Sequence, residues 1–282
     1  MTTKALFLVL AVMLMGTLTM LPQSSVQAEE AVLKAAGCKT EFFLLKDLAE
    51  AYRSKSGNKM QLGNTGNKKA VNLLLERKID FTFTCKPIEK LTKGLELDPN
   101  AVSSWTSVAI AKDPIVVVSN GKNGVQNVTS EQLTQMFQGN IANWRELGGA
   151  DLPVKTAYLA STLESGVVLL FKEFTVGDNG KLDEKAMIAN GPSMLGNFVS
   201  VTPGAVTFMG LNSYQDKYGV ILAIDGVAPT RENILAGKYS LAATYYLTLS
   251  GKDNQAVADF VEFTRSAEGK NTIEQNFISV SP

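Results

Sequence analysis

Apolar residues in the first part of the chain alternate between short runs and helical spacing. Residues 32–37, 59–62 and 79–84 have the length and apolar content typical of strands. Between them, apolar side chains recur every three or four positions over residues 42–52 and 70–75, which predicts two helices that each bury one face. This β-α-β-α-β order predicts a parallel sheet with ligand-facing loops at the carboxyl ends of its strands.

The middle of the chain repeats this order of elements. Residues 107–119 form a long extended apolar run that Pro114 interrupts, which favours a segment crossing between two units over one continuous central strand. Residues 153–159 then predict a strand, and the apolar spacing over residues 168–174 predicts the helix that follows. The chain is therefore predicted to be an α/β protein with two units.

Polar turns follow two of the predicted strands. The turn at residues 38–40 joins the first strand to the first helix, where backbone N–H groups lack partners and ligands of open α/β sheets bind. Asn67 is predicted to cap the second helix, and Lys68 follows in its first turn, where the helix dipole disfavours a cation. Lys68 belongs either to a solvated face or to the site of a bound anion.

The first residues resemble an export signal. Lys4 supplies a positive end, an apolar run follows, and residues 26–28 form a small-residue cleavage site, so residues 1–28 are predicted to be a signal peptide. An uncleaved signal anchor is the alternative. Export places the mature protein in the periplasm or at the cell exterior.

Composition excludes several classes of function. The chain has 27 basic and 27 acidic residues, which suggests neither nucleic acid nor a membrane surface as a partner. Histidine is absent, which removes the commonest general base and metal ligand. We expect no cofactor, no metal and no enzymatic activity.

Three segments carry a resemblance to a known family. Residues 128–149 read VTSEQLTQMFQGNIANWRELGG, residues 201–208 read VTPGAVTF, and residues 226–241 read GVAPTRENILAGKYSL. In these segments the chain resembles the phosphate-type periplasmic solute-binding proteins of ABC transporters. The match runs from about Leu33 to the C-terminus.

The resemblance implies a two-lobed periplasmic-binding-protein fold of type II, with two crossover segments between the lobes. Lobe 1 would consist of residues 29–113 and 210–282, and lobe 2 of residues 114–209. A small anionic solute would be held between the lobes and delivered to an ABC permease or a membrane sensor by a monomeric protein.

The family's anion contacts are largely replaced in this chain. The Asp that ends the third strand falls at Cys85, and the Arg of the later anion loop falls at Ser161. Their loss removes the charge-assisted contacts to a phosphate group. The resemblance nevertheless places the ligand among Cys38, Lys39, Thr40, Asn67, Lys68, Thr84, Cys85, Ser161, Thr162, Ser165, Gly166 and Val167.

Cys38 and Cys85 are the only cysteines in the chain. In the implied lobe the first and third strands are neighbours, so these two residues would come within reach of a disulfide. A reduced pair that binds a thiophilic ligand or responds to redox state is an alternative, and two unpaired small residues are another.

These observations predict an exported protein that binds a small anion, with a phosphate-like oxyanion as the first candidate. The alternative function is a sensor of a thiophilic oxyanion such as arsenite, or of redox state, through Cys38 and Cys85. A redox enzyme is disfavoured because the chain has no Cys-x-x-Cys pair and no nucleotide-binding glycine motif.

Overall fold

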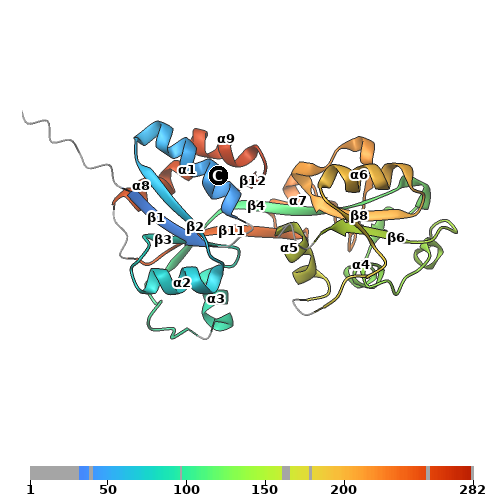
Figure 1. The fold of residues 1–282 in the computed structure, drawn as a ribbon, viewed down its shortest axis with the longest axis horizontal. Helices are drawn as coiled ribbons and strands as arrows, with labels where there is room; N and C mark the ends of the chain where they lie inside the picture. The colour runs from blue at the N-terminus through green and yellow to red at the C-terminus, as the bar shows by residue number, and fades with distance from the viewer. Residues whose placement is uncertain are drawn as a thin grey trace, which may run out of the picture.

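The computed structural model describes residues 32–37, 41–95, 97–160, 166–177, 180–251 and 255–280. Figure 1 shows two lobes side by side, joined by the strands β4 (Thr106–Ser119) and β11 (Ala242–Leu249). Lobe 1 combines the start and the end of the chain, and lobe 2 is built from the middle. The two-lobed α/β fold is therefore confirmed. The predicted signal peptide lies outside the described residues.

Lobe 1 is a twisted sheet with helices on both faces. Strand β1 pairs in parallel with β2 and β3, as the β-α-β-α-β pattern predicts, and β11 pairs antiparallel with β3. Its elements, besides β4 and β11, are β1 (Val32–Gly37), α1 (Phe42–Ser56), β2 (Lys59–Asn64), α2 (Asn67–Leu75), β3 (Phe81–Thr84), α3 (Ile88–Gly94), α8 (Gln255–Arg265), α9 (Ala267–Glu274) and β12 (Ile278–Ser279).

Lobe 2 contains a smaller sheet in which β6 pairs in parallel with β7 and β8. Its helices and strands are β5 (Asn127–Val128), α4 (Ser130–Phe137), β6 (Lys155–Leu159), α5 (Gly166–Phe174), β7 (Met187–Ala189), α6 (Pro192–Val201), β8 (Ala205–Gly210), β9 (Val220–Ile221) and β10 (Ala223–Ile224). Short 3-10 turns are η1 (Gly121–Asn123), η2 (Trp144–Leu147), η4 (Leu211–Ser213) and η5 (Asp216–Tyr218).

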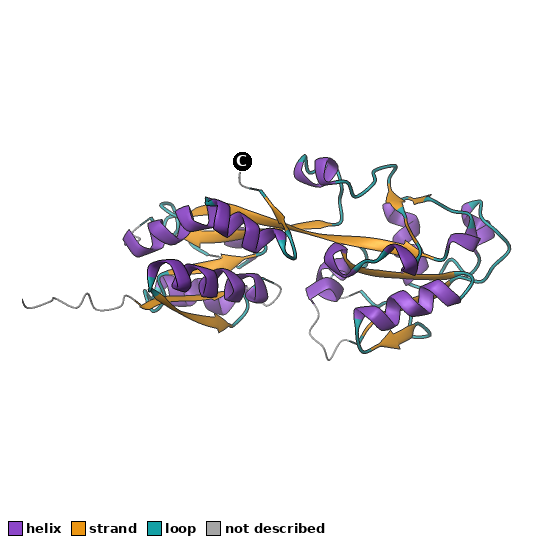
Figure 2. Ribbon diagram, turned by 90° about the horizontal axis from the view of Figure 1, so that it is seen from above, coloured by secondary structure: helices purple, strands orange, loops and turns teal. Residues whose placement is uncertain are grey.

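Strand β4 crosses from one lobe to the other without a break (Figure 2). Its first part pairs with β11 as far as Pro114, and its second part pairs with β8 from Ile115 onward. The predicted crossing at Pro114 is confirmed, but the expectation that Pro114 disfavours one continuous strand is wrong. Pro114 is tolerated because it occupies the position where the partner strand changes, so its missing N–H interrupts neither ladder.

The strand pairings after β8 bear on where the second crossing lies. Strand β9 pairs with the end of β4, β10 pairs with β5, and the Gly226 N–H donates to the Asn127 side chain at 2.7 Å, all within lobe 2. Helix α7 (Arg231–Leu235) is tied to lobe 1 by the Arg231–Glu274 ion pair. We therefore propose a boundary after Gly226 in place of the one expected at residue 210.

Large apolar side chains fill both lobes. Trp144 is completely buried, and its indole N–H donates to the Gly204 carbonyl at 2.8 Å. Trp105 belongs to a smaller buried cluster under α2 and α3. Both tryptophans are therefore packing residues. Within the described chain, no helix has the length and apolar character needed to cross a membrane.

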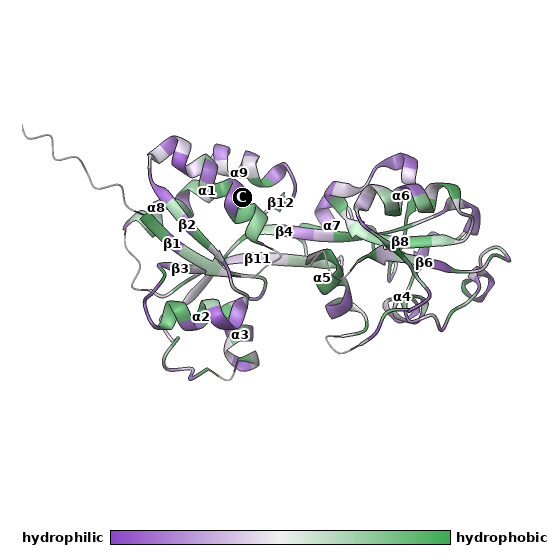
Figure 3. Ribbon diagram, in the orientation of Figure 1, coloured by the Kyte–Doolittle hydropathy of each residue, from purple (hydrophilic) through white to green (hydrophobic). Residues whose placement is uncertain are grey.

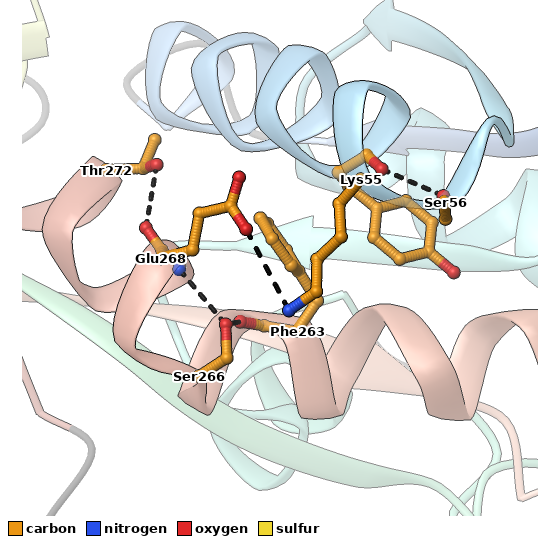
Figure 4. A network of polar contacts seen from close by, with 8 residues as sticks. Lys55, Ser56, Phe263, Ser266, Glu268 and Thr272 are labelled. Atoms are coloured by element: carbon orange, nitrogen blue, oxygen red, sulfur yellow. Dashed lines mark hydrogen bonds and ion pairs between the residues drawn. The ribbon is translucent and has the colours of Figure 1, made fainter.

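The end of α1 packs against α8 and α9 on the outer side of lobe 1 (Figure 4). The Lys55 ammonium lies 5.6 Å from the centre of the Phe263 ring and 3.8 Å from the Glu268 carboxylate. The Ser266 hydroxyl caps α9 by accepting a hydrogen bond from the Gly269 N–H. These contacts hold the chain's last helices on its first one, which closes lobe 1 around β1.

Candidate functional site

The end of β1, the end of β3 and the start of α2 lie together in lobe 1. A Cβ atom on Gly37 would lie 1.9 Å from the Phe83 carbonyl oxygen, so only glycine allows the two strand ends to approach this closely. The Gly66 N–H donates to the Gly37 carbonyl at 2.9 Å and fastens the turn before α2 to the end of β1. The predicted adjacency of the first and third strand ends is confirmed.

Asn67 lies at the amino end of α2 but does not cap it. The N-cap position is Gly66, whose φ of 77° suits glycine, and no side chain caps the helix. The Asn67 amide nitrogen instead donates to the Cys85 sulfur at 3.5 Å, while its buried amide oxygen has no hydrogen-bond partner. A buried acceptor without a donor costs free energy, so this oxygen marks a place where a ligand donor fits.

The Thr84 hydroxyl is used inside the protein. Thr84 is completely buried, and its hydroxyl donates to the Lys86 carbonyl at 2.8 Å and lies 3.1 Å from the Thr248 hydroxyl. Ser107 extends the chain of hydroxyl groups at 3.1 Å from Thr248 and accepts from the Ile88 N–H. With its hydrogen committed to Lys86, Thr84 has none left for a ligand, which speaks against its predicted role as a donor.

A cavity of about 320 Å³ lies between the lobes beside the crossing strand β11. Lobe 1 contributes the segment after β3, and lobe 2 contributes the apolar helix α5, which Figure 3 shows next to β11. The cavity is lined by Cys85, Lys86, Pro87, Lys90, Leu170, Glu173, Phe174, Ala242, Ala243, Thr244 and Tyr246. Lysine, threonine and tyrosine donors on an apolar wall suit a small anion.

An ion pair joins the two lobes at this cavity. The Lys86 ammonium lies 2.7 Å from the Glu173 carboxylate, and the two side chains are 40% and 37% exposed. Lys90 adds a second cation to the lining. Two lysines and one glutamate leave the cavity with a positive balance at neutral pH, which favours an anion.

The structure brings together only part of the predicted set. Asn67 and Cys85 touch, whereas the exposed Lys68 lies on the solvated outer face of α2. Gly166 begins α5, and Val167 follows as a half-buried residue that packs against the core. Cys38, Lys39, Thr40, Ser161, Thr162 and Ser165 lie outside the described residues, so their roles and the Cys38–Cys85 disulfide stay predictions.

Glu41 is a completely buried carboxyl group at the amino end of α1. A helix dipole favours a negative group in this position. The amino end of α1 therefore carries an acidic side chain of the protein itself, whereas the first turns of α2 and α5 contain no acidic residue.

Buried hydrogen bonds tie the two crossing strands together. The Tyr239 hydroxyl donates to the Ile115 carbonyl at 2.9 Å, and the Tyr245 hydroxyl donates to the Asp113 carboxylate at 2.5 Å. Burial raises the pKa of Asp113 to about 6, and the Tyr245 hydrogen bond offsets part of that rise. The crossing is therefore a well-bonded region with one titratable group.

Residues 23–268 match the sequence model of the PBP superfamily domain, which is most of the chain. The chain belongs to the PBP superfamily. The family resemblance expected from the motif at residues 128–149 is thereby confirmed.

Two named relatives are similar over nearly the whole chain. The phosphate-binding protein PstS of Borreliella burgdorferi is 22% identical over 267 residues, covering 90% of this chain and 92% of that protein. Protein SphX of Synechococcus elongatus is 24% identical over 277 residues, covering 92% of this chain and 81% of SphX.

Solved structures agree on the fold. PstS from Borrelia burgdorferi superposes with a TM-score of 0.74 at 19% identity, covering 89% of this chain and 99% of that structure. An ABC-type phosphate transport receptor from Vibrio cholerae superposes with a TM-score of 0.75 at 21% identity, covering 88% and 99%. These likenesses establish the two-lobed arrangement of this PBP superfamily member.

Two other cavities in this PBP superfamily chain are larger than the one between the lobes. One of about 630 Å³ lies beside the end of α1, and one of about 380 Å³ lies beside Lys155 at the start of β6. The predicted site residues next to these elements lie before the start of α1 and after the end of β6, whereas these two cavities lie at the end of α1 and at the start of β6. Chemistry and position, not volume, therefore favour the cavity between the lobes.

No metal site is found among the residues that the structure describes, where no three His, Cys, Asp or Glu side chains are grouped to hold an ion. Two functional candidates were missed by sequence reasoning. Lys90 and Glu173 line the cavity, but each lies on a helix surface where a solvated charge is the ordinary interpretation. Only the packing of the two lobes shows that Lys90 and Glu173 differ from ordinary surface charges.

Proposed function

We propose that this PBP superfamily member is an exported, non-enzymatic receptor that closes its two lobes around a small oxyanion of the phosphate type. It would act as a monomer and pass the solute to an ABC permease. Support comes from the two-lobed fold and from relatives named as phosphate-binding proteins. Closing two lobes around a solute is a standard hinge motion.

One observation carries the choice of a small anion. The cavity between the lobes is lined by two lysines and by Cys85, and Cys85 accepts from the amide nitrogen of Asn67, whose amide oxygen is buried without a partner. A protonated oxyanion offers what both need, since its charged oxygens suit the lysines and its O–H group suits a neutral acceptor. An uncharged acceptor replaces the Asp that the family resemblance expects at Cys85.

Calorimetry with inorganic phosphate tests the proposal. We expect phosphate or arsenate to bind the purified mature protein and to raise its unfolding free energy by about 2.7 kcal/mol at a hundredfold excess over Kd. Asn67→Ala should weaken binding by roughly ten- to a hundredfold, because a hydrogen bond to a charged group contributes about 1.5–3 kcal/mol. Asn72→Ala, on the exposed side of α2, is the matched control.

The same titration separates the rival function. Sulfate, molybdate and arsenite would be titrated with and without reductant. Binding of arsenite alone, and only after reduction, would replace the proposal with the thiophilic sensor expected from Cys38 and Cys85. Binding of no oxyanion under either condition would refute both.

A further inference from the structure

The ion pair between Lys86 and Glu173 is the starting point, because it connects the two lobes inside the cavity. Lys86 follows β3 in lobe 1, and Glu173 lies near the end of α5 in lobe 2. Glu173 is the only acidic residue among the described residues of the cavity lining. A carboxylate that points at a lysine in an anion cavity occupies the contact that a bound anion would use.

Hydrogen bonds hold the backbone around Lys86, and its side chain reaches from there to Glu173. The Lys86 carbonyl accepts from the buried Thr84 hydroxyl, and the Ile88 N–H two residues later donates to the Ser107 hydroxyl at 2.8 Å. Its side chain is 40% exposed. A lysine carries its charge on a flexible four-carbon stem, so the ammonium can change partners without movement of β3.

The strength of the pair decides what it can do. Half-exposed ion pairs contribute about 0–1 kcal/mol, because water and salt screen the attraction and two long side chains lose freedom. This pair is therefore too weak to fix the lobes. It is strong enough to compete measurably with a solute for the same ammonium group.

We propose that Glu173 is a built-in competitor of the solute that sets the affinity of the cavity for anions. In the solute-free protein its carboxylate holds the Lys86 ammonium, and an entering oxyanion takes Lys86 over and releases Glu173. The inference rests on the proposed function, since it assumes that the cavity takes an anion. Glu173 is thus an affinity-setting residue, because every anion that takes over Lys86 must first displace the Glu173 carboxylate.

Calorimetry with inorganic phosphate on four variants tests the competitor. Glu173→Gln should bind phosphate roughly two- to fivefold more tightly than the wild type at low salt, and the gain should shrink in high salt. Lys86→Gln should weaken binding. Adding Glu173→Gln to Lys86→Gln should then bring no further gain, because the competitor has lost the group for which it competes.

Glu184→Gln is the matched control for loss of one negative charge in lobe 2, since Glu184 pairs with Lys181 on the surface and both side chains are more than four-fifths exposed. It should leave the phosphate affinity unchanged.

The possible failures are distinguishable. Phosphate binding that Glu173→Gln leaves unchanged, or a gain that persists in Lys86→Gln or appears equally in Glu184→Gln, overturns the competitor and leaves the receptor function standing. Absence of phosphate binding in the wild type and in Glu173→Gln refutes the phosphate receptor and the competitor together.

Discussion

The two lobes meet in two regions that differ in burial and in the kind of bond they use. At the crossing strands, Tyr239 and Tyr245 make hydrogen bonds with buried groups of β4. At the cavity, the lobes meet through the Lys86–Glu173 ion pair, whose side chains are more than a third exposed. One region is sealed from water, and the other is wetted and polar.

This difference suggests that the crossing strands act as the hinge between the lobes, and that the Lys86–Glu173 contact can open. Breaking a buried hydrogen bond leaves an unsatisfied group in a medium without water, which is costly. Opening a half-exposed ion pair returns both charges to water at little cost. Lobe movement should therefore be easy at the cavity and confined to small rotations at the strands, and substitutions in the two regions should differ in size accordingly.

The largest expected effect is the pH dependence caused by Asp113. Burial raises its pKa from 3.8 to about 6, so between these values the folded state binds more protons than the unfolded state. Unfolding free energy should therefore fall as pH rises from 4 to 6, by on the order of 3 kcal/mol from this group. Asp113→Asn should remove this slope in denaturant titrations at several pH values.

The control is Asp216→Asn, which removes a carboxylate from the exposed turn η5. It should retain the wild-type pH profile. An unchanged slope in Asp113→Asn would show that the crossing does not contain the titrating group.

A smaller effect is expected for Tyr245→Phe, which removes the hydroxyl that donates to Asp113. The carboxylate then loses a hydrogen bond in a buried position, and we expect a loss of about 1–3 kcal/mol at pH 7. The loss should be smaller at pH 5, where Asp113 is mostly protonated. Chemical denaturation of Tyr245→Phe against Tyr214→Phe, whose hydroxyl bonds Gly219 within lobe 2, measures it.

The smallest effect is expected at the cavity. Lys86→Gln and Glu173→Gln should each change the unfolding free energy by less than about 1 kcal/mol, even though both change the affinity for phosphate. Denaturant midpoints at constant slope would show this. A loss as large as that of Tyr245→Phe would mean that the ion pair fixes the lobes, and the contrast between the two regions would disappear.

The elements and their order were predictable because they depend on local rules. The strand ends at Gly37 and Thr84 lie side by side because parallel strands joined by right-handed crossovers are placed that way. Segments whose position depends on pairing with distant parts of the chain were predicted less well. The boundary that we propose after Gly226 differs from the one expected at residue 210 because β9 returns to pair with β4, and no spacing in the sequence indicates that pairing.

Side-chain partners were the least predictable part. Asn67 has the residue type of a helix cap, yet its amide turns to Cys85, which lies 18 positions away. Thr84 has the residue type of an anion donor, yet Thr248 from the far end of the chain holds it inside. Glu173 can be recognised as a candidate only from its ion pair with Lys86 of the other lobe. Each outcome depends on tertiary neighbours that residue type and period do not specify.

The unbroken course of β4 through both lobes has a consequence for cooperativity. Its first part pairs with β11 and its second part with β8, so the same strand belongs to the sheets of both lobes. If either lobe unfolded by itself, the part of β4 in the other lobe would lose the continuation of its own strand. The two lobes can therefore turn relative to each other as separate bodies and yet unfold as one unit.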